Sequence, residues 1–237
     1  MRSRTDESEA GARAALLRAA QALNALGINQ GRSGNVSVRT AQGFLVTPSG
    51  VAYEAMTPDM LVPVTLDGGY RGDLRPSSEW RLHRDIYRHR PEAGAVVHVH
   101  STAATALACL RLRIPAFHYM VAMAGGTSIE LADYATFGTQ ELSDAMLAAL
   151  GPRRACLLAN HGQIAYGATL EKALDLAVEV EALARQYWHA RSLGEPVILS
   201  EAEMAEVTRR FAAYGKPAAE RTAADDAVLG FPHRLDG

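Results

Sequence analysis

Two histidines with one residue between them, His98 and His100, lie in the apolar run Val96-Val97-His98-Val99-His100, which is typical of a β-strand. Alternate residues of a strand point to the same face, roughly 6.6 Å apart, so both imidazoles can reach one metal ion. A third histidine stands in Asn160-His161-Gly162, where we expect a turn. Three imidazoles leave a divalent cation with an open coordination position, which is typical of a catalytic metal site. The alternative interpretation is a pair of solvent-facing histidines on a half-exposed strand.

Three segments rich in glycine and hydroxyl groups precede the histidine pair: 31–35, 47–50 and 76–78. We expect Ser77 and Ser78 to begin a helix, where free N–H groups and the helix dipole favour an anion. Any one of these segments could equally be an ordinary turn or cap, but three of them together favour a phosphate pocket. Arg32 would add a positive charge there, or it is a solvated loop residue.

Glu79 directly follows the paired serines. A carboxylate is common in the first turn of a helix, because the helix dipole favours it there. The functional alternative is a general acid/base beside both the phosphate and the metal.

The composition is that of an ordinary globular protein. The chain has 237 residues, 48% of them hydrophobic, and a formal net charge of -2. No basic field is present to hold a nucleic-acid backbone, and no apolar run is long enough to span a membrane. The N-terminal segment is charged and has no apolar signal region, and we expect Cys109 and Cys156 to be small core residues in a reducing compartment. These features predict a cytoplasmic protein that binds neither nucleic acid nor membrane.

Helical and strand patterns alternate along the chain without a linker that would divide it. We expect helices at 14–26, 77–90, 102–110, 140–150, 170–192 and 200–214, and strands at 35–39, 44–46, 61–66, 94–100, 156–159 and 163–166. Because some strands neighbour each other as hairpins and others are separated by helices, we predict the α/β class of α+β type: one domain with a mixed, mainly antiparallel sheet covered by helices. The domain takes residues 1–216, and 217–237 form a tail that is either mobile or packed on a neighbouring subunit.

Seven motifs together resemble the class II aldolase/adducin-head family, and most closely its L-fuculose-1-phosphate aldolases. In family order they are Asn29 to Ser37, Val46 to Gly50, Pro76 to Arg81, Val97 to His100, Ile114 to Tyr119, Tyr134 to Thr139 and Asn160 to Gly162. The sequence departs from the family pattern at Arg32-Ser33 and at Thr127.

The resemblance assigns roles to individual residues. It implies that His98, His100 and His161 bind zinc, with manganese or cobalt as alternative ions, and that Glu79 is the acid/base and a further metal contact. The implied phosphate site consists of Asn35, Ser49, Gly50, Ser77 and Ser78. The substrate pocket also includes Arg32 and Phe137, and Tyr214 closes over it. Tyr119 reaches a neighbouring subunit's site, which implies a homotetramer of C4 symmetry with shared active sites.

The reaction implied is retro-aldol cleavage of a ketose 1-phosphate, with L-fuculose 1-phosphate expected first. The alternatives are a 5-deoxyribulose or 5-methylthioribulose 1-phosphate aldolase, a sugar-phosphate 4-epimerase, and a non-catalytic adducin-like module. The intact set of three histidines and Glu79 argues against the last. His83 and His89, which stand among arginines in an expected helix, are interpreted as surface groups.

Overall fold

A seven-stranded sheet forms the centre of the computed structural model, which describes residues 4–213 and 222–229. The strands are β1 (Asn35–Thr40), β2 (Gly43–Val46), β3 (Val62–Thr65), β4 (Ala95–Val99), β5 (Leu131–Ala132), β6 (Ala155–Leu158) and β7 (Gly162–Gly167). Their order across the sheet is β3-β2-β1-β4-β7-β6-β5, and only the β5–β6 pair is parallel. The predicted mixed, mainly antiparallel sheet is therefore confirmed.

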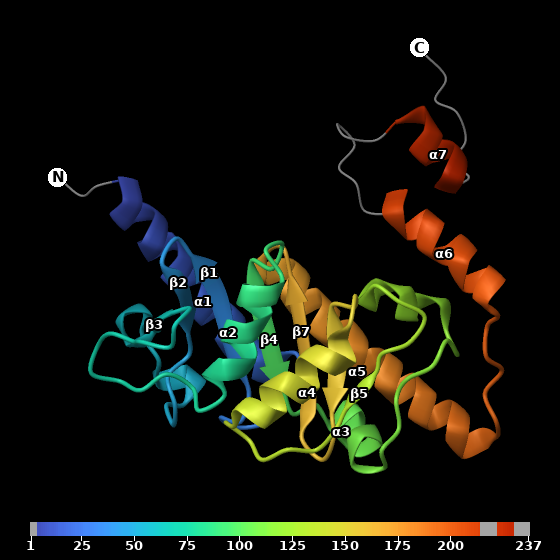
Figure 1. Ribbon diagram of the computed structural model, residues 1–237, viewed down its shortest axis with the longest axis horizontal. Helices are drawn as coiled ribbons and strands as arrows, with labels where there is room; N and C mark the ends of the chain where they lie inside the picture. The colour runs from blue at the N-terminus through green and yellow to red at the C-terminus, as the bar shows by residue number, and fades with distance from the viewer. Residues whose placement is uncertain (1–3, 214–221, 230–237) are drawn as a thin grey trace.

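Helices cover both faces of this sheet (Figure 1). They are α1 (Arg4–Ala25), α2 (Trp80–His89), α3 (Thr102–Cys109), α4 (Gln140–Leu150), α5 (Leu170–Leu193), α6 (Glu201–Ala213) and α7 (Ala223–Leu229). Short 3-10 turns occur at η1 (Tyr53–Ala55), η2 (Pro58–Met60) and η3 (Tyr119–Ala124). In the described part of the chain, no helix is both long enough and apolar enough to cross a membrane.

Two apolar cores result from this layering. Residues of α1, α3 and α5 pack on one face of the sheet with Val97 and Val99, and residues of α2 and α4 pack on the other with Val96 and Ile164. Burying each large aliphatic side chain contributes about 1.5–3 kcal/mol, so both faces of the central strands are held firmly. At the C-terminal end, α6 and α7 stand away from the sheet, as Figure 1 shows.

Several helix ends have side-chain caps that the sequence signals. Thr139 and Thr169 accept hydrogen bonds from the N–H groups of Leu142 and Lys172 at the starts of α4 and α5. Ser200 and Glu203 form the expected capping box before α6, with Ser200 N donating to Glu203 Oε2 at 2.7 Å. These local signals set where the long helices begin.

Other expectations need correction. Helix α2 begins at Trp80 with Glu79 as its N-cap, so Ser77 and Ser78 lie in the turn before it rather than in its first turn. Cys109 is exposed and only Cys156 is a core residue. The two-residue strand β5 and the helix α7 are structural features that the sequence patterns do not predict. The predicted division at residue 216 falls in a segment, 214–221, outside the described residues.

Candidate active site

Strand β4 places the first histidine in the middle of the protein. This strand lies between β1 and β7, and His98 has no exposed surface. The alternative of two solvent-facing histidines on a half-exposed strand is therefore wrong. The Nδ1 atom of His98 is 2.8 Å from the carbonyl oxygen of Gln163. Because a carbonyl can only accept, Nδ1 donates to it, and this bond turns Nε2 to the opposite side, toward Glu79.

A tight turn between β6 and β7 brings His161 to the same place. Asn160 adopts a left-handed conformation with φ of 54°, which asparagine tolerates better than most residues. Gly162 lies so close to the backbone of Val99 and His100 that a Cβ atom would collide with the Val99 carbonyl oxygen. The Asn-His-Gly sequence therefore lets the turn lie directly against the end of β4.

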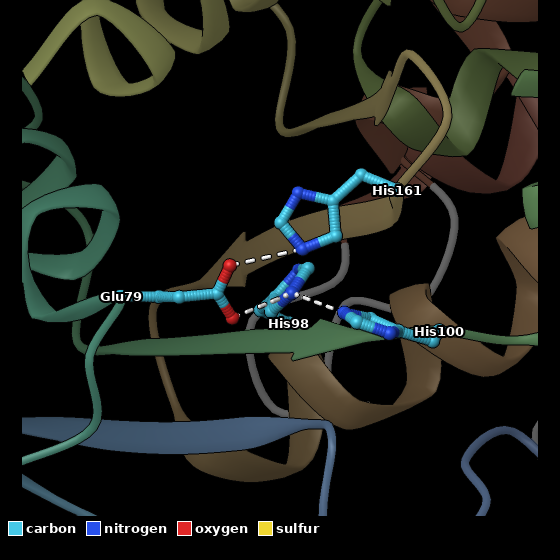
Figure 2. A group of neighbouring side chains, drawn as sticks. All are labelled: Glu79, His98, His100 and His161. Atoms are coloured by element: carbon cyan, nitrogen blue, oxygen red, sulfur yellow. Dashed lines mark hydrogen bonds and ion pairs between the residues drawn. The ribbon is translucent and has the colours of Figure 1, made fainter. Parts of the chain in front are cut away.

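Figure 2 shows Glu79 and the three histidines pointing toward one another from these separate segments. Glu79 Oε2 is 3.0 Å from His98 Nε2, and Glu79 Oε1 is 2.9 Å from His161 Nε2. The Nε2 atoms of His98 and His100 are 3.1 Å apart. One atom from each of the four residues lies within 4.8 Å of all the others.

The charges within this cluster are strongly coupled. Burial alone would raise the pKa of Glu79, but the His98 and His161 rings outweigh it and hold that pKa well below its usual range. Burial opposes protonation of His98, but the Glu79 carboxylate raises the pKa of His98 above its ordinary value. Burial and the neighbouring rings lower the pKa of His100 to about 3, so this ring is neutral at pH 7.

This donor set fits a divalent cation. Glu79 Oε1 is buried and accepts no hydrogen bond of good geometry, although His161 Nε2 is close to it. Three imidazole nitrogens and a carboxylate oxygen, all within 4.8 Å of one another, match the ligand types and spacing of a catalytic zinc-type site. Such a cation would satisfy Oε1 and relieve the repulsion among the rings.

A cavity of about 340 Å³ opens beside the cluster. Of the residues predicted for the site, those that line it are Arg32, Asn35, Ser49, Gly50, Ser77, Ser78, Glu79, His100, Phe137 and His161. The three glycine- and hydroxyl-rich segments thus meet on one wall, and the cluster forms another. Tyr134 and Asn160 line the cavity as well, although we assigned them no role from the sequence.

Backbone and side-chain hydrogen bonds tie the three loops together. Ser77 N donates to Thr47 O at 3.0 Å, and Glu79 N donates to Ser77 Oγ at 3.2 Å. Arg32 Nη1 donates to Gly50 O at 2.9 Å, which holds its guanidinium at the cavity wall. This wall therefore carries a positive charge, hydroxyl groups and a left-handed glycine turn at Gly50, with φ of 77°.

Besides the fully buried His98, two predicted site residues are not part of this cavity's described lining. Tyr119 is half exposed and lines a separate apolar groove with Met120, Val207 and Phe211. Tyr214 lies outside the described residues, and its predicted role remains an expectation.

The interpretation of His83 as a surface group is wrong. It is fully buried rather than at the surface, and its Nε2 lies 2.5 Å from Asn35 Oδ1. Its position could have been found from helical spacing, because Leu82, Ile86 and Tyr87 mark the same buried side of α2.

The fold and the cluster define a metal-binding protein with an open, mainly antiparallel sheet and a polar cavity, and comparison with known proteins identifies the class. The family model described as "Class II Aldolase and Adducin N-terminal domain" matches residues 14–188. The chain is 53% identical over 200 residues to the 5-methylthioribulose-1-phosphate/5-deoxyribulose-1-phosphate aldolase of Rhodospirillum rubrum, covering 84% of this chain and 90% of that protein. It is 50% identical over 191 residues to the L-fuculose phosphate aldolase of Escherichia coli K12, covering 80% and 89% respectively.

A solved structure of an L-fuculose 1-phosphate aldolase superposes with a TM-score of 0.83 at 38% identity, covering 85% of this chain and 96% of that one. The chain therefore belongs to the class II aldolase and adducin N-terminal domain family. It is a class II aldolase, a metal-binding lyase of the aldehyde-lyase type.

Proposed function

We propose that this aldolase cleaves a ketose 1-phosphate to dihydroxyacetone phosphate and an aldehyde. One observation carries the proposal: Glu79 and two of the histidines line the same cavity as the three glycine- and hydroxyl-rich loops. A cation site and an anion site in one cavity suit a substrate with a phosphate near its carbonyl carbon.

The ion we propose is Zn²⁺, held by His98, His100 and His161 with Glu79 as a further contact. Imidazole and carboxylate ligands suit zinc, and manganese or cobalt could replace it with the same residues. When bound, the cation supplies Lewis-acid stabilisation of negative charge on the substrate's oxygens.

The loop residues fix the other end of the substrate. Asn35, Ser49, Gly50, Ser77 and Ser78 offer an amide, hydroxyl groups and backbone N–H groups, and these suit a phosphate dianion. Arg32 adds one positive charge to the same wall. Holding the phosphate there orients C3 toward Glu79, which is the proximity contribution to catalysis.

Glu79 and a tyrosine move the protons. As the C3–C4 bond breaks, the C4 hydroxyl gives its proton to Tyr119 of a neighbouring subunit, which releases its own phenolic proton to solvent. The Glu79 carboxylate takes up a proton from solvent and delivers it to C3, which gives dihydroxyacetone phosphate and regenerates the carboxylate. Tyr214 closes over the cavity. Sharing of this kind needs an oligomer, and we propose a homotetramer of C4 symmetry with shared sites.

The sugar is proposed to end in an apolar group. Phe137, Tyr134 and Ala135 line the cavity, so an unsubstituted methyl or a methylthio end is favoured there. L-fuculose 1-phosphate is our first candidate, and 5-deoxyribulose or 5-methylthioribulose 1-phosphate is the second. The similar aldolases from Rhodospirillum rubrum and Escherichia coli bear the names of the two activities, so they support either choice.

A substrate panel tests the proposal. Purified zinc-loaded protein is given the three ketose 1-phosphates and their unphosphorylated counterparts, and release of free dihydroxyacetone phosphate is measured. We expect release from at least one phosphate ester and little turnover of the free sugars. Epimerised sugar without free dihydroxyacetone phosphate would show a 4-epimerase, and equal turnover of phosphorylated and free ketoses would refute the phosphate pocket.

A further inference from the structure

Behind the candidate active site lies a histidine that the proposed reaction does not use. His83 faces strand β1 from helix α2, one helical turn beyond Glu79, and is fully buried. Asn35 and Ser37 are alternate residues of β1, so their side chains share the face that packs on α2. Both are buried as well.

Hydrogen bonds join these side chains into one continuous chain that ends at the catalytic carboxylate. Ser37 Oγ is 2.8 Å from Tyr87 OH and 2.6 Å from His83 Nδ1. On the other side of the ring, His83 Nε2 is 2.5 Å from Asn35 Oδ1. Asn35 Nδ2 then donates to Glu79 Oε2 at 3.0 Å.

The direction of donation follows from the Asn35 amide. Its Nδ2 group donates to Glu79 Oε2, so its oxygen faces His83, and an amide oxygen can only accept. The ring therefore carries a proton on Nε2. The ring is neutral because burial lowers the pKa of His83 to about 3, so Nδ1 accepts from the Ser37 hydroxyl, which in turn accepts from Tyr87.

We propose that His83 is a positioning residue, which acts through Asn35 to hold the Glu79 carboxylate in its reactive orientation. The inference rests on the proposed role of Glu79 as the acid/base. Without the Nε2–H donor, the Asn35 amide is free to turn over and place its oxygen against the carboxylate. The charge-assisted hydrogen bond would then be replaced by a repulsive contact.

Substitutions of His83 separate positioning from simple packing. His83→Leu removes the donor, whereas His83→Gln keeps an N–H group near the Nε2 position. His83→Asn is too short to reach Asn35 and serves as a second loss variant if the leucine variant does not fold. We expect kcat/KM to fall about 10- to 100-fold in the leucine and asparagine variants, the range of one charge-assisted hydrogen bond. The glutamine variant should stay within about threefold of the wild type.

A double-mutant cycle shows whether the effect passes through the amide. In an Asn35→Ala background, the further change His83→Leu should alter kcat/KM by less than about threefold, because the group it acts on is gone. Equal losses in both backgrounds, or no rescue by His83→Gln, would overturn the proposal.

A measurement that does not depend on turnover distinguishes failure of this inference from failure of the proposed function. Nitrogen NMR of histidine-labelled protein, assigned by the signal missing in His83→Gln, should show the neutral His83 ring with its proton on Nε2. A proton on Nδ1 would overturn the inference. If no ketose 1-phosphate is cleaved but the Nε2–H form is observed, the proposed function fails while the hydrogen-bond chain is supported.

Discussion

Glu79 contacts His98, His161 and Asn35 through its two carboxylate oxygens, so one side chain touches both the cation site and the amide that lines the cavity. Replacing it with glutamine keeps the size but removes the charge and the proton-transfer ability. We expect Glu79→Gln to lower turnover about 10²–10⁴-fold, the range for a lost general acid/base, while the fold is retained. Steady-state kinetics and circular dichroism measure this, with the exposed Glu141→Gln as the control. Near-normal turnover of Glu79→Gln would remove this residue from the mechanism.

The two ends of the cavity should respond differently to substitution. Ser77 lies in the loop wall, and Phe137 is an exposed aromatic residue on the cavity's rim. Ser77→Ala should raise KM for every ketose 1-phosphate by about tenfold, since a hydrogen bond to a charged group is lost. Phe137→Ala should instead change the ranking of the substrates.

Kinetics with the panel of three phosphate esters distinguish the two effects. Ser192→Ala, at the far end of α5, is the control and should leave every KM unchanged. A ranking altered by Ser77→Ala, or left intact by Phe137→Ala, would contradict this assignment of the two ends.

The positions of the histidine cluster could be predicted because its signals are local. His98 and His100 follow the two-residue period of a strand, and His161 stands in a turn that needs glycine at the next position. Tyr134 could not be assigned a role in this way, since its place in the cavity depends on how the segment before α4 lies over the sheet. His83 was misjudged because its arginine neighbours suggested a solvated face, although the apolar spacing of α2 marks it as buried.

At the scale of elements, long helices with threonine or serine caps were predicted within a few residues. Strand β5 was missed because a pair of residues carries no period, and its pairing with β6 depends on the rest of the sheet. The start of α2 was placed too early because paired serines are also common in turns. A cap signal therefore fixes a helix start only when the side chain makes the capping bond.

Helix α3 has an unusual cap that comes from another helix. Its N-cap Ser101 makes no side-chain capping bond, and Glu181 of α5, which is buried, accepts instead from Ala103 N at 2.9 Å and Ala104 N at 3.0 Å. Glu181→Gln leaves one of these N–H groups facing an NH2 group, with no acceptor, and gives the other only a neutral acceptor. We expect a loss of about 1–3 kcal/mol in the free energy of unfolding, measured by urea denaturation.

Arg185 provides the matched control for that change. It lies on the same helix, is largely exposed, and is 3.5 Å from Glu181. Arg185→Ala should change the free energy of unfolding by less than about 1 kcal/mol, because exposed ion pairs contribute little. If both variants lost equal stability, the ion pair rather than the helix cap would be the important contact.

At the scale of the whole molecule, apolar side chains are exposed where α5 ends and the chain continues to α6. Leu193 is 91% exposed and Val197 is 85% exposed, and Tyr119 lines the apolar groove beside α6. Exposed apolar side chains of this kind commonly mark contact surfaces between subunits. They support the proposed assembly, in which Tyr119 of one subunit reaches the cavity of the next.

Mixed tetramers test this sharing of sites. In the proposed ring of four subunits, each site would take its histidines from one chain and Tyr119 from its neighbour. Tyr119→Phe and His98→Ala parents should each have little activity. When they are unfolded and refolded together in equal amounts, a site is intact only if a Tyr119→Phe chain receives its tyrosine from a His98→Ala chain. Random assortment makes about a quarter of the sites intact, so we expect about a quarter of the wild-type activity per subunit.

The control mixture combines two variants whose substituted residues come to each site from the same subunit. Glu79 and His98 are 3.0 Å apart within one subunit, so every site in a mixture of Glu79→Gln and His98→Ala chains keeps one defect. This mixture should regain nothing, because no exchange of partners restores a complete cluster. If the first mixture also regained nothing while light scattering showed mixed tetramers, Tyr119 would act within its own chain or not at all. If the wild type were active as a monomer at assay concentration, the shared-site arrangement itself would be wrong.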